Sequence, residues 1–164
     1  ALVLSGLLGG AACGSDAGTG GQPASSSTTM VLAPTSTVVP VARDLLASDA
    51  DPPGAPGRTL SLVRYTIAPG AQLPPHVHPG VQMASIEAGT LSYTVITGTA
   101  TVKRSSGTVE SVTGPATTAL GPGDAVTETG DMVHFGANAT GAPVIILASL
   151  LTESGQDLAV LVPQ

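Results

Sequence analysis

Short stretches in which apolar and polar residues alternate recur from residue 41 to the end of the chain, with glycine and proline between them. Alternation with a period of two is typical of β-strands, because successive side chains of a strand point to opposite faces. In the stretch 60–67 both faces carry apolar side chains, such as Leu62 on one face and Val63 on the other. We therefore expect this strand to lie between two layers.

The same pattern predicts several further strands. They are 82–88, 91–97, 100–104, 109–112, 117–120, 124–127, 132–136, 144–151 and 158–162. The segment 41–47 fits either a strand or a short helical turn. Glycines between the strands, such as Gly89, Gly98 and Gly130, indicate turns. Many short strands at this spacing predict an all-β domain, either a sandwich or a jelly-roll barrel.

The composition agrees with an all-β fold. Hydrophobic residues make up 42% of the 164 residues but aromatic residues only 2%, so the core must consist largely of Val, Leu, Ile and Ala. The β-branched types among them favour strands. The 21 glycines and 14 prolines predict many turns and few helices. The length allows one domain, which we place at residues 31–164.

The charge balance argues against one class of partner. The formal net charge is −6, and Lys and Arg together number only 5. A basic surface that neutralises phosphates is therefore not expected, so we predict no nucleic-acid binding and no attraction to anionic membranes.

The first residues differ from the rest. The stretch ALVLSGLLGGAAC (1–13) is apolar and ends in small residues before Cys13. It is too short to cross a bilayer, so we interpret it as a truncated export signal, followed by a flexible Gly/Ser/Thr linker at 14–30 in a disordered tail. The stretch resembles the signal of a bacterial lipoprotein. That resemblance implies a lipid on Cys13, membrane contact only through this lipid, and an extracytoplasmic location, at the cell surface or secreted. An ordinary cleaved signal, or an unprocessed tail with a free thiol, is the alternative.

The chain has three histidines. His76 and His78 are two residues apart, so both side chains point to the same side of the chain. His134 lies in another predicted strand. Neutral imidazole is the commonest metal ligand, and three of them around one ion leave coordination positions open. The alternative is that His76 and His78 are ordinary loop residues.

Two stretches resemble the two sequence motifs of the cupin superfamily. The first motif is matched by Gly70, His76, His78, Gln82 (where Glu is usual) and Gly89, and the second by Gly123, His134 and Asn138. The resemblance is to single-domain, quercetin-dioxygenase-like small cupins. It implies a jelly-roll β-barrel, also called a double-stranded β-helix, and a small-molecule substrate or ligand. Cupins often pair through strand edges, so a homodimer is a further expectation.

The resemblance also implies a ligand set. Cupins usually hold iron, manganese, zinc, copper or nickel with three His and one Glu, and His76, His78 and His134 match the three imidazoles. Gln82 offers only a neutral amide in place of the carboxylate. Either Gln82 is a weak fourth ligand, or three His hold one divalent metal while Gln82 forms a hydrogen bond to a bound water or substrate. The alternative is that Gln82 merely begins the strand.

Other polar residues receive less specific interpretations. Glu87 has the opposite parity to Gln82 and should point away from the site. We expect Glu128 and Asp131 to be solvated beside a turn. Tyr93 should pack in the core with its hydroxyl hydrogen-bonded. Asn138 begins a glycosylation sequon, but a turn cap is the favoured role.

Nucleophilic catalysis finds no support, because no serine or cysteine of the predicted domain lies in a recognisable nucleophile motif. We predict an exported metal-binding cupin, a small-molecule dioxygenase or oxidase with a three-His metal centre. The alternative is a non-catalytic cupin that binds a metal or ligand at the cell surface. A second polar group beside the histidines, able to act as an acid or base, would favour the enzyme.

Overall fold

The computed structural model describes residues 40–163, so the predicted export signal (1–13), the linker (14–30) and Cys13 lie outside the described residues. Residues 40–163 form twelve strands, which confirms the all-β prediction. They are β1 (Val41–Ala50), β2 (Arg58–Ile67), β3 (His76–Val77), β4 (Gly80–Ala88), β5 (Leu91–Thr97), β6 (Thr99–Lys103), β7 (Val109–Thr113), β8 (Ala116–Leu120), β9 (Ala125–Thr129), β10 (Val133–Ala137), β11 (Val144–Glu153) and β12 (Val160–Leu161). Within this range, no helix is long and apolar enough to cross a membrane.

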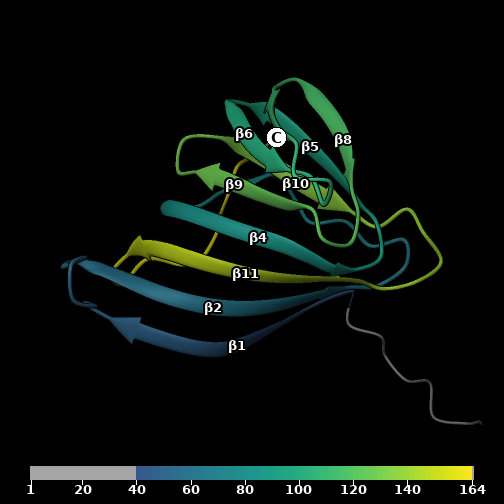
Figure 1. The fold of residues 1–164 in the computed structure, drawn as a ribbon. Coiled ribbons are helices and arrows are strands. Elements are labelled where there is room, and N and C mark those ends of the chain that lie inside the picture. Colours follow the sequence, from purple (N-terminus) through teal and green to yellow (C-terminus); the bar gives the residue numbers. More distant parts are fainter. Residues whose placement is uncertain (1–39, 164) are drawn as a thin grey trace, which may run out of the picture. The chain divides into compact units, whose positions relative to one another are not determined.

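The strands form two antiparallel sheets. The larger sheet has the order β1-β2-β11-β4-β9-β6-β7, and the smaller has the order β12-β3-β10-β5-β8. In Figure 1, β1, β2, β11, β4 and β9 lie side by side, and β10, β5 and β8 belong to the second layer. Consecutive strands are often in different sheets, as in a jelly roll.

The core lies between the two sheets. Along β11, alternate residues from Val144 to Leu150 are buried, and β5 contributes Leu91 and Val95 from the opposite sheet. The hydrophobic core cluster is largely aliphatic, as the composition predicts. Burial of these side chains is the main favourable contribution to folding, at about 25 cal/mol for each Å² of apolar surface removed from water.

The segment 41–47, for which a strand and a helical turn both remained open, belongs to strand β1. It pairs with β2 over nearly its whole length, with one irregularity between Leu45 and Ala47. The prediction that 60–67 lies between two layers is wrong. Leu60 and Leu62 are 43% and 36% exposed, because the outer face of β2 has no second layer against it among the described residues.

The exposed apolar side chains on this outer face extend beyond β2. Val81 and Met83 of β4 are also exposed, and Ser149 of β11 pairs with both Leu62 and Met83, so these residues share one row of the sheet. The predicted homodimer stays a prediction.

Asn138 fixes the turn after β10. Its side-chain amide donates hydrogen bonds to the carbonyl oxygens of Ile67 and Ala142, at 3.0 and 2.8 Å, and its Oδ1 accepts one from the backbone N–H of Thr140. The predicted turn cap is confirmed. The side chain is buried in the folded domain.

Candidate metal centre

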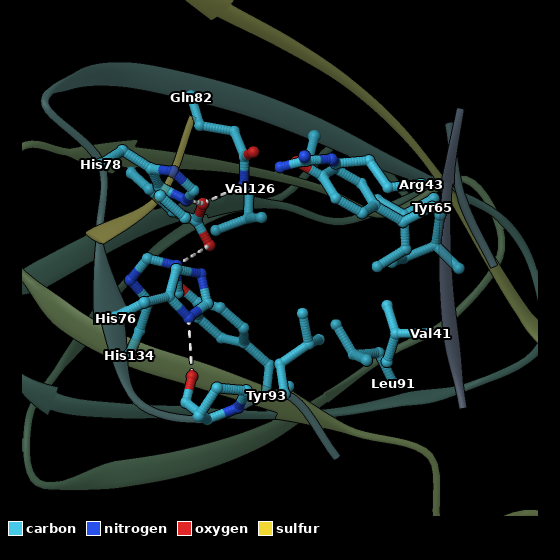
Figure 2. Close-up of a pocket in the computed structure, with 18 of the residues that line it drawn as sticks. Val41, Arg43, Tyr65, His76, His78, Gln82, Leu91, Tyr93, Val126 and His134 are labelled. Atoms are coloured by element: carbon cyan, nitrogen blue, oxygen red, sulfur yellow. Dashed lines mark hydrogen bonds and ion pairs between the residues drawn. The ribbon is translucent and has the colours of Figure 1, made fainter. Parts of the chain in front are cut away.

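The backbone brings the three histidines together. His76 of β3 and His134 of β10 are register partners across the smaller sheet, and His78 follows β3 directly. All three side chains are buried, and one ring nitrogen of each lies within 4.8 Å of those of the other two. Figure 2 shows the three rings gathered at one side of a cavity. Their predicted role as metal ligands remains a proposal.

Backbone carbonyls determine which nitrogens face one another. His76 Nδ1 lies 2.9 Å from the carbonyl oxygen of Pro74, and His78 Nδ1 lies 2.6 Å from that of Leu158. A carbonyl oxygen only accepts, so each Nδ1 carries the proton and each Nε2 presents a lone pair. This arrangement is the one that orients metal-binding histidines in proteins.

Burial also favours the neutral imidazole. The pKa of His76 is lowered to about 4, chiefly because burial disfavours the charged ring and further because His134 is close. At neutral pH His76 is therefore uncharged, which is the form that binds a metal.

A carboxylate lies beside the imidazoles, from a residue predicted to be solvated. Glu128 is only 2% exposed; its Oε1 is 3.2 Å from His134 Nε2 and its Oε2 is 3.4 Å from His78 Nε2. The prediction for Glu128 is wrong because strand β9 continues to Thr129, beyond the predicted end at 127. Inside the strand, Glu128 shares the inward parity of Val126. This shared parity is the sequence signal from which the inward direction of Glu128 could have been predicted.

The charge state of this carboxyl depends on its imidazole neighbours. Burial raises the pKa of Glu128, and the contacts with His134 and His78 lower it below its usual range when these rings carry a proton on the nitrogen that faces the carboxylate. Within the described residues, Glu128 forms ion pairs only with these two imidazoles and with no Lys or Arg. By contrast, Asp131 is exposed and Glu87 pairs with Arg64 on the surface, as predicted.

Gln82 reaches the same place from β4. Gln82 and Glu128 are register partners on β4 and β9, and Gln82 Nε2 donates a hydrogen bond to Glu128 Oε2. Gln82 Oε1 is buried and has no partner among residues 40–163. The two predicted roles of Gln82, a weak metal ligand or a hydrogen-bond partner of water or substrate, stay predictions.

Tyr93 of β5 completes the polar side of the cavity. It is buried as predicted, with its ring centroid 5.8 Å from that of His134. The hydrogen bond expected for its hydroxyl is not formed within the described part of the chain, where Oη has no partner. Burial, together with the negative charge of Glu128, raises the pKa of this phenol, so the hydroxyl keeps its proton and can donate.

The cavity has a volume of about 270 Å³ and lies between the two sheets. Leu91, Ile86 and Ile146 are among the residues that make its walls mostly apolar. Figure 2 shows the side chains of Arg43 and Tyr65 along the top of the cavity, extending from the right towards Gln82. The polar groups of the cavity therefore lie at the imidazoles and along this upper wall, and Leu91 and Val41 lie at the lower right.

The site fits a divalent transition metal. His78 Nε2 is a buried lone pair without a hydrogen-bond partner, and it faces a carboxylate oxygen that also only accepts. Two acceptors repel each other unless a cation or a proton lies between them. Imidazole nitrogen and carboxylate oxygen together suit first-row divalent ions.

The chain was compared with known proteins. The sequence matches no protein-family model and none of the curated proteins. Solved structures do match. An oxalate oxidase in complex with the substrate analogue glycolate has a TM-score of 0.51 and 21% identity, over 76% of this chain and 56% of that chain. A second oxalate oxidase structure has a TM-score of 0.53 and 22% identity, over 84% of this chain and 63% of that chain. This chain thus spans less than two thirds of either protein, and the likeness confirms the predicted fold.

Proposed function

We propose that this chain, which has the cupin fold, is a metal-dependent enzyme that acts on a small organic molecule, with His76, His78 and His134 as metal ligands. The observation that carries the proposal is the convergence of three buried ring nitrogens within 4.8 Å at one side of an apolar cavity. Such a metal would polarise a bound substrate, and a redox-active ion would also transfer electrons.

One polar group beside the imidazoles favours an enzyme over a binding protein. Tyr93 keeps a proton on a hydroxyl that has no partner in the described chain, so it is available to donate to a substrate. A site that only stores a metal needs no free donor next to its ligands.

The rest of the cavity favours a substrate with an anionic group. Arg43 lines the cavity and forms no ion pair with any residue between 40 and 163. Burial raises the pKa of the neighbouring Tyr65 phenol, so this hydroxyl also keeps its proton. Both groups donate hydrogen bonds, and guanidinium groups match the geometry of carboxylates. We therefore infer a substrate with a carboxylate for Arg43, an exposed residue whose side chain lines the cavity, and with its reactive part at the imidazoles.

The first test is metal content. The full chain is expressed in media supplemented separately with iron, manganese, zinc, copper and nickel, and the purified protein is measured by elemental analysis. We expect about one equivalent of metal, and its loss in His134→Ala and His76→Ala. Asp131→Asn, an exposed acidic residue near His134, is the matched control and should keep the metal. A folded wild-type protein that takes up none of these metals would overturn the proposal.

The second test is activity. The resemblance to quercetin-dioxygenase-like small cupins puts dioxygenase and oxidase reactions first, so oxygen consumption is measured with a panel of small carboxylic acids. Consumption that requires both metal and substrate supports the enzyme. Metal binding without turnover of any acid, in the presence of tight ligand binding, would favour the alternative of a binding protein.

Export and lipidation of Cys13 are separate proposals, supported only by the sequence 1–13. Metabolic labelling of the full precursor with a fatty acid tests them. Label in the wild type and none in Cys13→Ser is the expected result.

A further inference from the structure

We propose that Glu128 supplies the carboxylate ligand of the metal from strand β9, and that Gln82 positions this carboxylate from strand β4. The inference rests on the proposed metal centre and assigns its anionic ligand. It differs from the cupin pattern described above, in which the residue at the Gln82 position provides the carboxylate.

The register of the two strands allows a carboxylate on either β4 or β9 to reach the same place. Gln82 and Glu128 are directly paired across β4 and β9, and side chains so placed lie on the same face of the sheet with their Cβ atoms about 4.5–5.5 Å apart. A carboxylate on either strand therefore reaches the same space. In this chain the pair consists of an amide on β4 and an acid on β9.

The distances fit ligands of one ion. Bonds of about 2.0–2.2 Å from a metal to nitrogen or oxygen place neighbouring ligand atoms roughly 3.0–3.5 Å apart. Glu128 Oε1 is 3.2 Å from His134 Nε2, and Oε2 is 3.4 Å from His78 Nε2. Each carboxylate oxygen thus lies at ligand spacing from one imidazole. Only the ring nitrogens of the three histidines all lie within 4.8 Å of one another, so binding of one ion by all four residues requires Glu128 to move closer to them.

The charge balance points the same way. The carboxyl group of Glu128 is buried, and the basic side chains nearest to it in residues 40–163 are two imidazoles rather than a Lys or Arg. A buried charge without compensation is costly. Since the proton of His78 is already on Nδ1, facing the carbonyl of Leu158, the Nε2 atom has none to give to Glu128 without becoming charged. A divalent cation compensates the carboxylate and uses both lone pairs.

Gln82 acts through Glu128. Its Nε2 donates to Glu128 Oε2, which orients the carboxylate towards the imidazoles. This role requires the amide donor and no direct contact with the metal. Gln82 is therefore a positioning residue, and outer partners of this kind are typically worth about 10- to 100-fold in metal affinity.

The decisive experiment moves the carboxylate from position 128 on β9 to position 82 on β4. The dissociation constants of Mn²⁺ and Zn²⁺ are measured on the full chain by competition with a chelator, for the wild type, Glu128→Gln and the double variant Gln82→Glu/Glu128→Gln. We expect about 100-fold weaker binding in the single variant, taking the upper end of that range for a ligand, and recovery of most of it in the double variant. In the double variant a carboxylate is again present, on the neighbouring strand, and the total charge is unchanged.

The reference variants separate the inference from the proposed function. If Glu128→Gln binds both ions as tightly as the wild type while His134→Ala does not, the metal centre stands and a proton, not a metal, lies between Glu128 and the imidazoles. A folded double variant as weak as the single one also overturns the inference, because the carboxylate then acts only at its own position. If His134→Ala binds both ions like the wild type, the proposed metal centre itself is wrong.

Two further measurements cover misfolding and the role of Gln82. Circular dichroism and thermal unfolding establish that each variant folds, and Glu128→Asp, which keeps the charge, should bind with intermediate affinity. Gln82→Leu, which removes the donor, should weaken Mn²⁺ binding by about tenfold. It should also alter the electron paramagnetic resonance spectrum of the bound Mn²⁺. An unchanged spectrum and affinity would show that Gln82 does not position the ligand.

Discussion

His76 and His134 are paired residue to residue across β3 and β10, so a backbone ladder sets the separation of two imidazoles from distant parts of the chain. Strand β3 contains only His76 and Val77, and it is paired on its other edge with β12. The first two histidines therefore depend on pairing with both neighbours for their position. We expect perturbations near this short strand to appear in metal affinity before they appear in the overall fold.

Gly130 is the most direct place to test this dependence. It lies in the turn between β9 and β10, where a Cβ atom would stand 2.9 Å from the carbonyl oxygen of His78 and 3.1 Å from that of Gly80. Gly130→Ala therefore pushes the turn away from the His78 backbone. We expect a loss of about 1–3 kcal/mol in the free energy of unfolding, and weaker Mn²⁺ binding.

Gly141→Ala is the matched control, because a Cβ atom there meets no atom within 4 Å. Gly141→Ala should leave the free energy of unfolding and the Mn²⁺ affinity close to those of the wild type. Both variants are measured by denaturant unfolding and chelator competition. Equal metal affinity in Gly130→Ala and Gly141→Ala would contradict the dependence of His78 on this turn.

Tyr93→Phe separates stability from turnover. The hydroxyl of Tyr93 is buried without a partner in the described residues, so its removal should leave the melting temperature unchanged or slightly higher. If the phenol donates a proton to the substrate, kcat falls by about 100-fold while metal content stays the same. A fall in melting temperature together with unchanged kcat would show that the hydroxyl has only a structural role.

Arg43→Gln tests the anionic end of the substrate. For an acid that the enzyme turns over, we expect KM to rise by about tenfold or more, because a charged hydrogen bond contributes roughly 1.5–3 kcal/mol. The methyl ester of the same acid lacks the charge and serves as the control. An equal change in KM for the acid and the ester would mean that Arg43 does not recognise the carboxylate.

The sequence predicted the fold and the convergence of the three histidines. Alternation, a local signal, placed His76 and His78 on one side of the chain, and the resemblance to the two cupin motifs linked them to His134. The direction of Gln82 followed from the same parity, and its burial agrees with it. Such signals need no knowledge of which strands are neighbours.

Glu128 was missed because its burial depends on distant partners. A carboxylate near a strand end is usually solvated, and only the pairing of β9 with β4 and the approach of His78 and His134 change that balance. The prediction that 60–67 lies between two layers was wrong for the opposite reason. Its apolar outer residues suggest a covering layer, but the sheet order leaves that face of β2 open within the described structure.

Asp124 gives a pH-dependent prediction away from the metal centre. Its carboxylate accepts hydrogen bonds from the backbone N–H groups of Ser105 (2.8 Å) and Gly121 (3.0 Å) and from the Arg104 guanidinium (3.0 Å). Burial would raise the pKa of Asp124, but these donors outweigh it and hold the pKa below its usual value of 3.8. The folded state therefore binds this proton more weakly than the unfolded state does.

The sign of the effect follows from this lowered pKa. The stabilisation by Asp124 is complete above pH 3.8 and is lost as the pH falls through the lower pKa of the folded state. At pH 7, Asp124→Asn should be less stable than the wild type by roughly 1–3 kcal/mol, the cost of losing hydrogen bonds to a charged group. The difference should shrink as the pH falls below 3.8. Urea unfolding from pH 7 to pH 2.5 measures it, with the exposed Asp49→Asn as control. A stability difference between the wild type and Asp124→Asn that stays constant over this range would show that the charge of the Asp124 carboxylate does not stabilise the folded state.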